Sequence, residues 1–329
     1  MLILLLLQGA CDGEPLSGEA RQAAQPEFRV ALLTPGSISD GGWNGGAYEG
    51  LTLIRDKLGA KISHIETKTP AEFEESFRDY GSRGYDLIFG HGFEYQDAAA
   101  RVGSEYPQSI FITTSGSTVR ANVAPMVFEL EQATYLCGWM AARMSRTGKL
   151  GLIGGIDLPS IRSTFMAFAA GVQAGNPDVE VREVFLGNFD DIAAAREAAL
   201  ALIEEGVDFL LHQANEAGRG VFQAASERQT EEKPLYVFGT NRNQNAMAPD
   251  VVIASATLDI PAAFLEVASR VKQGTFRPEP LRLGMAEGIV SLEFNPALEA
   301  RLSPELRAEL DDLAASIRRG DLVVPRGAF

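Results

Sequence analysis

At 329 residues the chain is long enough for about two domains of ordinary size. Its hydrophobic fraction of 46% is sufficient for packed cores, which excludes a disordered protein. The net charge is −15 and no basic cluster occurs, which argues against nucleic acid as a partner because phosphate backbones require clustered lysine and arginine.

The first eleven residues differ from the rest of the chain. Leu2–Leu7 is an apolar run, too short to span a membrane, and Gln8-Gly9-Ala10-Cys11 follows it. The pattern resembles a bacterial lipoprotein signal, although no basic residue precedes the run and Gln8 stands where a small or aliphatic residue is usual. We expect Cys11 to be a lipid anchor and residues 1–27 to form a signal and a flexible tether. The alternative is an ordinary apolar tail.

From Phe28 onward, short apolar segments alternate with helical patterns. The first group of predicted strands covers 28–33, 60–65, 85–89 and 109–113, with helices near 44–58, 70–82 and 95–105. This alternation predicts parallel strands with right-handed crossovers. Residues 119–127, which include Pro125, are expected to be irregular, and a long apolar helix follows from Phe128 to about Gly148.

The alternation then begins again. We predict strands at 149–153, 180–185, 208–212, 235–238 and 251–256, and helices at 161–174, 191–205, 218–228 and 261–273. Residues 281–285 and 288–292 are predicted to form a β pair, and 304–318 a final amphipathic helix.

This order of elements predicts an α/β fold with two doubly wound parallel-sheet lobes. The elements after the second unit suggest that the chain crosses between the lobes more than once, so that the crossings form a hinge. We assign 28–128 and about 256–285 to the first lobe, and 129–255 and about 286–329 to the second. A hinge between two such lobes makes a closing cleft.

Polar and aromatic residues follow seven of the predicted strands. If the lobes face each other, these loops line one cleft, because ligands bind outside the carboxyl ends of strands in open α/β sheets. Such a pocket suits one small polar molecule. The candidate ligand-binding residues are Ser37, Asp40, Trp43, Asn44, His91, Phe93, Thr114, Asn188, Phe189, Asn215 and Asn241.

Trp43 gives this loop set its chemical character. Its flat apolar face beside amide and carboxylate groups suits a planar heterocycle better than a bare phosphate. The alternative is that Trp43 only covers the sheet edge. The candidate polar residues also have structural alternatives: helix caps for Asp40, Asn44, Asp157 and Asp190, and buried structural histidines for His91 and His212.

Signatures of catalysis are missing from the sequence. It contains no G-x-G-x-x-G, no P-loop and no G-x-S-x-G elbow. Its three histidines and two cysteines show no metal-ligand spacing, and Cys137 is expected to be a buried, inert thiol. We therefore expect no catalysis, no cofactor and no metal.

Four segments of the chain resemble a known family, the basic membrane protein or PnrA-like substrate-binding lipoproteins of ABC transporters. They are the loop and helix 40–50 (DGGWNGGAYEG), the helix start 128–138, the segment 188–201 and the closing segment 274–290. The resemblance covers about 28–298, nearly the whole mature chain.

The resemblance implies a type I periplasmic-binding fold with a three-stranded hinge. It also implies capture of a small molecule, often a purine base or nucleoside, for an ABC permease, and an extracytoplasmic location with a lipid anchor. On this pattern Trp43 is the stacking aromatic, Asn44 is a polar contact, and Asp40 and Phe93 lie in loops lining the site. Solitary receptors of this fold are usually monomers, so we expect a monomer.

The sequence departs from nucleoside-binding members at three places. Thr113-Thr114 and Asn241-Arg242-Asn243 stand where carboxylates are usual, and Leu258 is nearest to the place of a lysine. Neutral groups would then read the ligand's edge, and a free base becomes as plausible as a nucleoside. Two other functions stay open: a sensor that signals to a membrane kinase, and an enzyme using Asp40 or Asp190 with His91.

Overall fold

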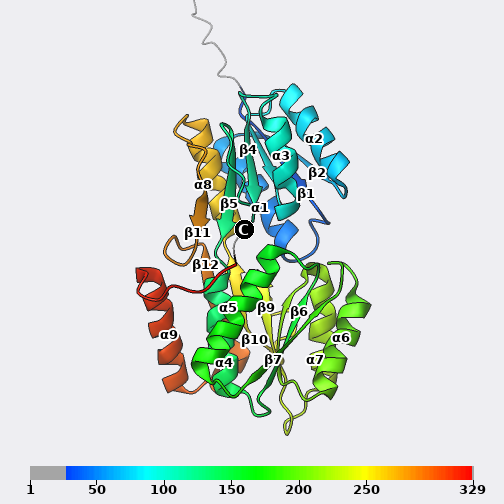
Figure 1. Ribbon diagram of the computed structural model, residues 1–329, viewed down its shortest axis with the longest axis vertical. Helices are drawn as coiled ribbons and strands as arrows, with labels where there is room; N and C mark the ends of the chain where they lie inside the picture. Colours follow the sequence, from blue (N-terminus) through cyan, green and yellow to red (C-terminus); the bar gives the residue numbers. More distant parts are fainter. Residues whose placement is uncertain (1–26, 328–329) are drawn as a thin grey trace, which may run out of the picture.

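The computed structural model describes residues 27–327, and Cys11 with its flanking segment lies outside them. Two α/β lobes are stacked along the long axis of the molecule (Figure 1). The strands of the first lobe are β1 (Arg29–Thr34), β2 (Lys61–Glu66), β3 (Leu87–Gly90), β4 (Ile110–Thr114), β5 (Val123–Phe128) and β11 (Leu281–Leu283). They form one six-stranded sheet in the order β11-β5-β4-β3-β1-β2, and every neighbouring pair is parallel.

The second lobe repeats this architecture. Its strands are β6 (Lys149–Gly154), β7 (Glu180–Phe185), β8 (Phe209–Gln213), β9 (Tyr236–Asn241), β10 (Val252–Leu258) and β12 (Val290–Phe294). The sheet order is β12-β10-β9-β8-β6-β7, and β12 runs antiparallel to β10 while the other pairs are parallel.

Helices cover both faces of each sheet. The α-helices are α1 (Trp43–Leu58), α2 (Pro70–Ser82), α3 (Gln96–Gly103), α4 (Glu131–Met144), α5 (Pro159–Gly175), α6 (Ile192–Glu204), α7 (Gly218–Arg228), α8 (Ile260–Lys272) and α9 (Pro304–Arg319). Short 3₁₀ turns are η1 (Phe93–Tyr95), η2 (Asn215–Ala217) and η3 (Pro296–Arg301).

The faces follow from the two-residue period of the strands. Val30 and Leu32 of β1 belong to the core that contains α1 and α8, whereas Ala31 and Leu33 belong to the core that contains α2 and α3. In the second lobe α4 and α5 share one face and α6 and α7 the other. Buried on both faces, the strands are almost continuously apolar, as parallel strands usually are.

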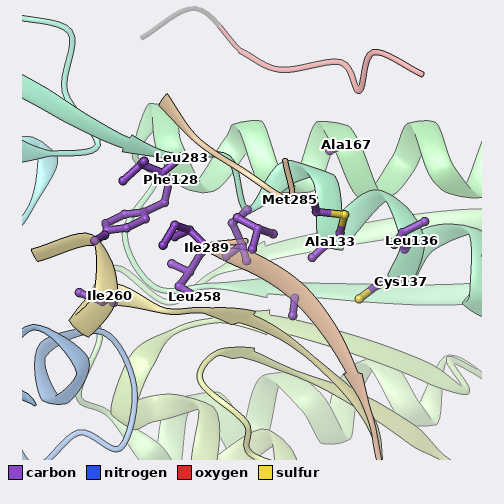
Figure 2. Packing of buried hydrophobic residues seen from close by; sticks show 14 of the residues in the cluster. Phe128, Ala133, Leu136, Cys137, Ala167, Leu258, Ile260, Leu283, Met285 and Ile289 are labelled. Atoms are coloured by element: carbon purple, nitrogen blue, oxygen red, sulfur yellow. The ribbon is translucent and has the colours of Figure 1, made fainter. Parts of the chain in front are cut away.

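The chain passes between the lobes three times, at β5–α4, β10–α8 and β11–β12. The crossings lie side by side, and their side chains pack into one cluster that continues into both lobes (Figure 2). Phe128, Leu130, Leu258, Met285 and Ile289 are buried members of this cluster from the three crossings. These crossings are the hinge that the sequence predicted.

One prediction was wrong at the end of the first unit. The segment expected to be irregular contains β5, an inner strand between β4 and β11. Asn122 and Met126 accept hydrogen bonds from the β4 side, so the nitrogen of Pro125 faces the other side. There β11 begins pairing only at Met126, so the missing N–H of Pro125 removes no ladder bond.

The predicted pairing of 281–285 with 288–292 was also wrong. β11 extends the first sheet beside β5, and β12 extends the second sheet beside β10. Each segment completes the edge of a different sheet, and the turn between them is the third crossing. Glu287 fixes this turn, because its carboxylate accepts a hydrogen bond of 2.8 Å from the backbone N–H of Gly284.

No helix among residues 27–327 combines the length and apolar character needed to cross a membrane.

Candidate functional site: a cavity between the lobes

A cavity of about 90 Å³ lies between the two lobes, at the carboxyl ends of strands from both sheets. Parallel α/β sheets place ligands at this edge. Its walls come from the first lobe, the hinge and the second lobe. The lining residues are Pro35, Trp43, Gly92, Phe93, Glu94, Phe128, Leu130, Glu131, Leu158, Ser160, Ile161, Thr164, Phe189, Gln213, Asn215, Asn241 and Leu258.

Trp43, the first residue of α1, forms the aromatic wall of the first lobe. Its ring stacks on His91 with a centroid distance of 4.0 Å and an interplanar angle of 22°. Its indole N–H donates to the backbone carbonyl of His91 at 3.4 Å, and Phe128 packs against it edge-on. These contacts hold the indole in one orientation beside the cavity.

His91 and Thr114 support Trp43 from behind and do not line the cavity. The His91 Nε2 lies 3.0 Å from the Trp43 carbonyl, which only accepts, so Nε2 carries the proton. Nδ1 then accepts from the Thr114 hydroxyl at 3.3 Å. Burial lowers the pKa of His91 to about 3, so the imidazole is neutral at neutral pH.

Asp40, Asn44 and Ser37 also lie outside the cavity wall. The Asp40 carboxylate accepts from the backbone N–H groups of Gly42, Asn44 and Gly45 at 2.9–3.0 Å. It therefore caps the start of α1, the structural alternative considered for it. Asn44 is buried, and the exposed Ser37 hydroxyl accepts from the N–H of Ser39.

Phe189 forms the aromatic wall of the second lobe. The Phe189 ring packs against Gly155, in the space that a Cβ at this position would need. The Phe189 carbonyl accepts a hydrogen bond of 2.9 Å from the backbone N–H of Ala217. Asn188 does not line the cavity, since its Oδ1 accepts from the N–H groups of Asp190 and Asp191. Asp191, rather than its exposed neighbour Asp190, caps α6.

Two asparagines of the cavity wall have unusual backbone conformations. Asn215 has φ of 46° and Asn241 has φ of 66°, both in the left-handed region. Asparagine tolerates this region better than most residues, and such conformations often occur at binding sites. Asn215 and Asn241, together with Phe93 and Phe189, are candidate residues that line the cavity. Their contact with a ligand stays a prediction.

The sequence did not point to several lining residues. Glu94 and Glu131 place two carboxylates in the wall. That neutral groups read the ligand stays a prediction. Glu94 follows a predicted strand end and could have been found there. Glu131 follows the first crossing, where only the location of the hinge would have identified it. Apolar hinge residues of the wall, Phe128, Leu130 and Leu258, were missed for the same reason.

The residues considered for catalysis do not meet in this cavity. Asp40 caps α1, His91 lies behind Trp43, and Asp190 is exposed outside the wall. Within residues 27–327 no group of three or more His, Cys, Asp or Glu side chains is arranged to hold a metal ion. Cys137 is buried as expected, and burial raises the pKa of its thiol.

Polar contacts join the lobes at the rim of the cavity. Arg242, just after β9, forms an ion pair of 2.8 Å with Glu49 of α1. Arg219 of α7 donates to the backbone carbonyl of Ser39 at 3.4 Å. These contacts link the second lobe to the first.

Known proteins share this architecture. The family model described as ABC transporter substrate-binding protein PnrA-like matches residues 28–319. Basic membrane protein A of Borreliella burgdorferi is 27% identical, with 99% of this chain and 95% of the relative covered. A purine-binding protein of Brucella abortus is 25% identical, with 94% and 86% covered. An ABC transporter solute-binding protein from Aeropyrum pernix has a TM-score of 0.83 at 23% identity, with 91% and 94% covered.

Two α/β lobes, a three-crossing hinge and a cavity between the lobes define a two-lobed solute-binding protein of the type I fold. The chain belongs to the PnrA-like family of ABC transporter substrate-binding proteins, whose model spans nearly all of the described residues.

Proposed function

We propose that this protein captures a planar heterocycle, a purine base or nucleoside, for an ABC importer, without catalysis. The observation that carries the proposal is the indole of Trp43, held in place by His91, in a cavity lined by both lobes. Base stacking on an aromatic side chain is favourable for any planar ring. The name of the Brucella abortus relative, a purine-binding protein, supports the same ligand class.

Two features bear on whether the ligand carries ribose. The apolar Leu258 and the amide of Asn241 line the cavity, where nucleoside-binding relatives were expected to have charged groups. Glu94 and Glu131, however, supply carboxylates that could accept from hydroxyl groups. Both the free base and the nucleoside therefore belong to the proposal.

Mass spectrometry of small molecules released by denaturing the purified protein tests the ligand class. We expect an intact purine base or nucleoside in about stoichiometric amount. A thermal-shift screen of bases, nucleosides, sugars and amino acids then ranks the ligands, because a bound ligand stabilises the folded state by mass action. A sugar or an amino acid that binds while every purine fails would overturn the proposal.

The two tryptophans allow a direct test of stacking. In a Trp139→Phe variant Trp43 is the only fluorescent indole, and Trp139 lies in α4 outside the cavity wall. We expect purine to quench this fluorescence, and Trp43→Ala to weaken binding about 10- to 100-fold, since stacking contributes ~1–3 kcal/mol per base. Trp43→Phe should retain most of the affinity. Unchanged affinity in Trp43→Ala would show that the ligand does not stack there.

We further propose that the mature protein is a monomer outside the cytoplasm, anchored by lipid at Cys11 and docking on a membrane permease. The lipoprotein-like pattern before Cys11 supports the anchor, and family membership supports the permease. Cell fractionation tests the anchor: Cys11→Ala should move the protein from the membrane to the soluble fraction. An equal distribution of both forms would remove lipid attachment at Cys11 from the proposal.

A further inference from the structure

Among residues 27–327, the charged side chains that line the cavity are all acidic. Glu94 and Glu131 line it, and no lysine, arginine or histidine of this part of the chain does. A carboxylate accepts hydrogen bonds and donates none while ionised. A wall of this kind favours a ligand with N–H donors and disfavours an anionic ligand.

Of the two carboxylates, Glu131 has an oxygen without a hydrogen-bond partner among the described residues. Its side chain is 3% exposed at the start of α4. Oε1 accepts from the Ser163 hydroxyl at 2.5 Å, and the Arg326 Nε lies 4.0 Å from this same oxygen. The second oxygen, Oε2, has no hydrogen-bond partner among the described residues. A buried acceptor without a donor is costly, so a donor from the ligand would be favoured at this oxygen.

Glu94 stands in the opposite, first-lobe wall. Its carboxylate folds back over Gly92, where it occupies the space that a side chain at position 92 would need. Burial raises the pKa of both glutamates, because removal from water disfavours an ionised carboxylate. The two acceptors thus line the cavity from the first lobe and from the start of α4.

We propose that Glu131 determines specificity by accepting a hydrogen bond from an amino group of the ligand, so that amino-substituted purines bind in preference to their oxo counterparts. This inference rests on the proposed function and names the ligand subclass. Adenine and guanine carry an exocyclic amino donor, whereas hypoxanthine and xanthine carry a carbonyl at the corresponding position. A carbonyl placed against a carboxylate would leave two acceptors facing each other, as happens when a site built for a donor meets an analogue without one.

Isothermal titration of the wild type with two matched pairs, adenine against hypoxanthine and guanine against xanthine, tests the preference. The nucleosides replace the bases if only nucleosides bind. We expect the amino compound of at least one pair to bind about ten-fold or more tightly, the range of a charge-assisted hydrogen bond. Glu131→Gln should reduce the ratio to about three-fold or less, because an amide can turn its N–H₂ toward a carbonyl.

Glu129→Gln is the matched control. Glu129 lies two residues earlier on the same crossing, forms an ion pair with Arg326 at 3.5 Å, and does not line the cavity. The Glu129→Gln variant should keep the wild-type ratio between the affinities of the amino and oxo compounds. If purines bind but the oxo compound equals or exceeds its amino partner in both pairs, this inference fails and the proposed function stands. If no purine binds, the proposed function fails and the inference with it. The wild-type comparison decides the preference even if Glu131→Gln does not fold, and an unchanged ratio in folded Glu131→Gln would overturn the role of Glu131.

Discussion

His91 shows how one buried residue can serve a binding site that it does not line. Its ring is stacked on the Trp43 indole, and both of its ring nitrogens are engaged, by the Trp43 carbonyl and the Thr114 hydroxyl. Protonation would bury a positive charge whose ring nitrogens contact a carbonyl and a hydroxyl but no carboxylate. The aromatic wall therefore depends on a neutral imidazole.

This environment predicts a pH dependence of stability. The pKa of His91 is about 3 in the folded protein and about 6.5 when unfolded. Between these values the unfolded chain binds a proton that the folded protein does not, so stability falls as pH decreases from about 6.5 toward 3. We expect His91→Gln to reduce the slope of unfolding free energy against pH by up to about 1.4 kcal/mol per unit between pH 4 and 6.

Urea unfolding at several pH values measures this slope. His212 is a useful second case, because burial lowers its pKa to about 4 and Gln244 accepts its Nε2–H. His212→Gln should flatten the slope in the same direction over a slightly narrower range. An unaltered slope in His91→Gln would mean that His91 is not buried as a neutral group.

For single residues, the sequence predicted which positions lie at the cavity better than it predicted what each side chain does there. Strand-end reasoning found Trp43, Phe189 and Asn241, because a parallel sheet brings all of its strand ends to one edge. It could not separate a ligand contact from a supporting residue such as His91, since both occupy the same kind of loop. Only the three-dimensional contacts distinguish them.

At the scale of elements, the tightest helix contact lies between α4 and α5, where two glycines allow the backbones to touch. A Cβ at Gly171 would overlap the carbonyl oxygen of Tyr135 and lie 2.9 Å from its carbon, and Gly138 makes a similar approach to Phe168. We expect Gly171→Ala to destabilise the protein by about 1–3 kcal/mol, because backbone atoms cannot move aside as a flexible side chain can.

Gly175→Ala in the same helix is the graded control. Its Cβ would lie 3.1 Å from the Trp139 carbonyl, so only a small shift is needed. Alanine is also the better helix former by about 1 kcal/mol, which offsets part of the contact. Chemical denaturation should therefore rank Gly171→Ala well below Gly175→Ala in stability. Equal stabilities would contradict the close packing of α4 and α5.

The elements themselves could largely be predicted because buried parallel strands and amphipathic helices have clear periods. The exceptions were strands whose partners are remote in sequence. Pro125 made β5 look irregular, because the sequence does not show where β11 pairs with β5. This pairing begins only after Pro125, so the proline nitrogen stays unpaired without cost. β11 and β12 looked like a hairpin because local sequence does not show that each joins a different sheet.

At the scale of the whole molecule, closure of the lobes links ligand binding in the cavity to the contacts at its rim. The hinge is one apolar cluster formed by all three crossings (Figure 2). The rim is held by polar contacts. A packed hinge maintains its contacts as the lobes move, but a rim contact exists only when they meet. Any such contact therefore favours the closed state, and ligand affinity increases with the population of that state.

The Arg242–Glu49 ion pair is the clearest test of this coupling. Its side chains are 34% and 53% exposed, and a solvent-exposed pair contributes about 0–1 kcal/mol. We expect Glu49→Gln to weaken ligand binding by about two- to fivefold, mainly through faster dissociation, with little change in the unfolding free energy of either lobe. Raising the salt concentration should bring the wild type toward the variant, since salt screens exposed charges.

The Arg196–Glu227 pair supplies the control, because it has similar exposure but joins α6 to α7 within the second lobe. Glu227→Gln should leave ligand dissociation unchanged, whereas Arg242→Ala should match Glu49→Gln, and the double variant should be no weaker than either single one. Stopped-flow dissociation rates separate these cases. Equal loss in Glu227→Gln and Glu49→Gln would assign the effect to general surface charge, and the rim pair would then have no part in closure.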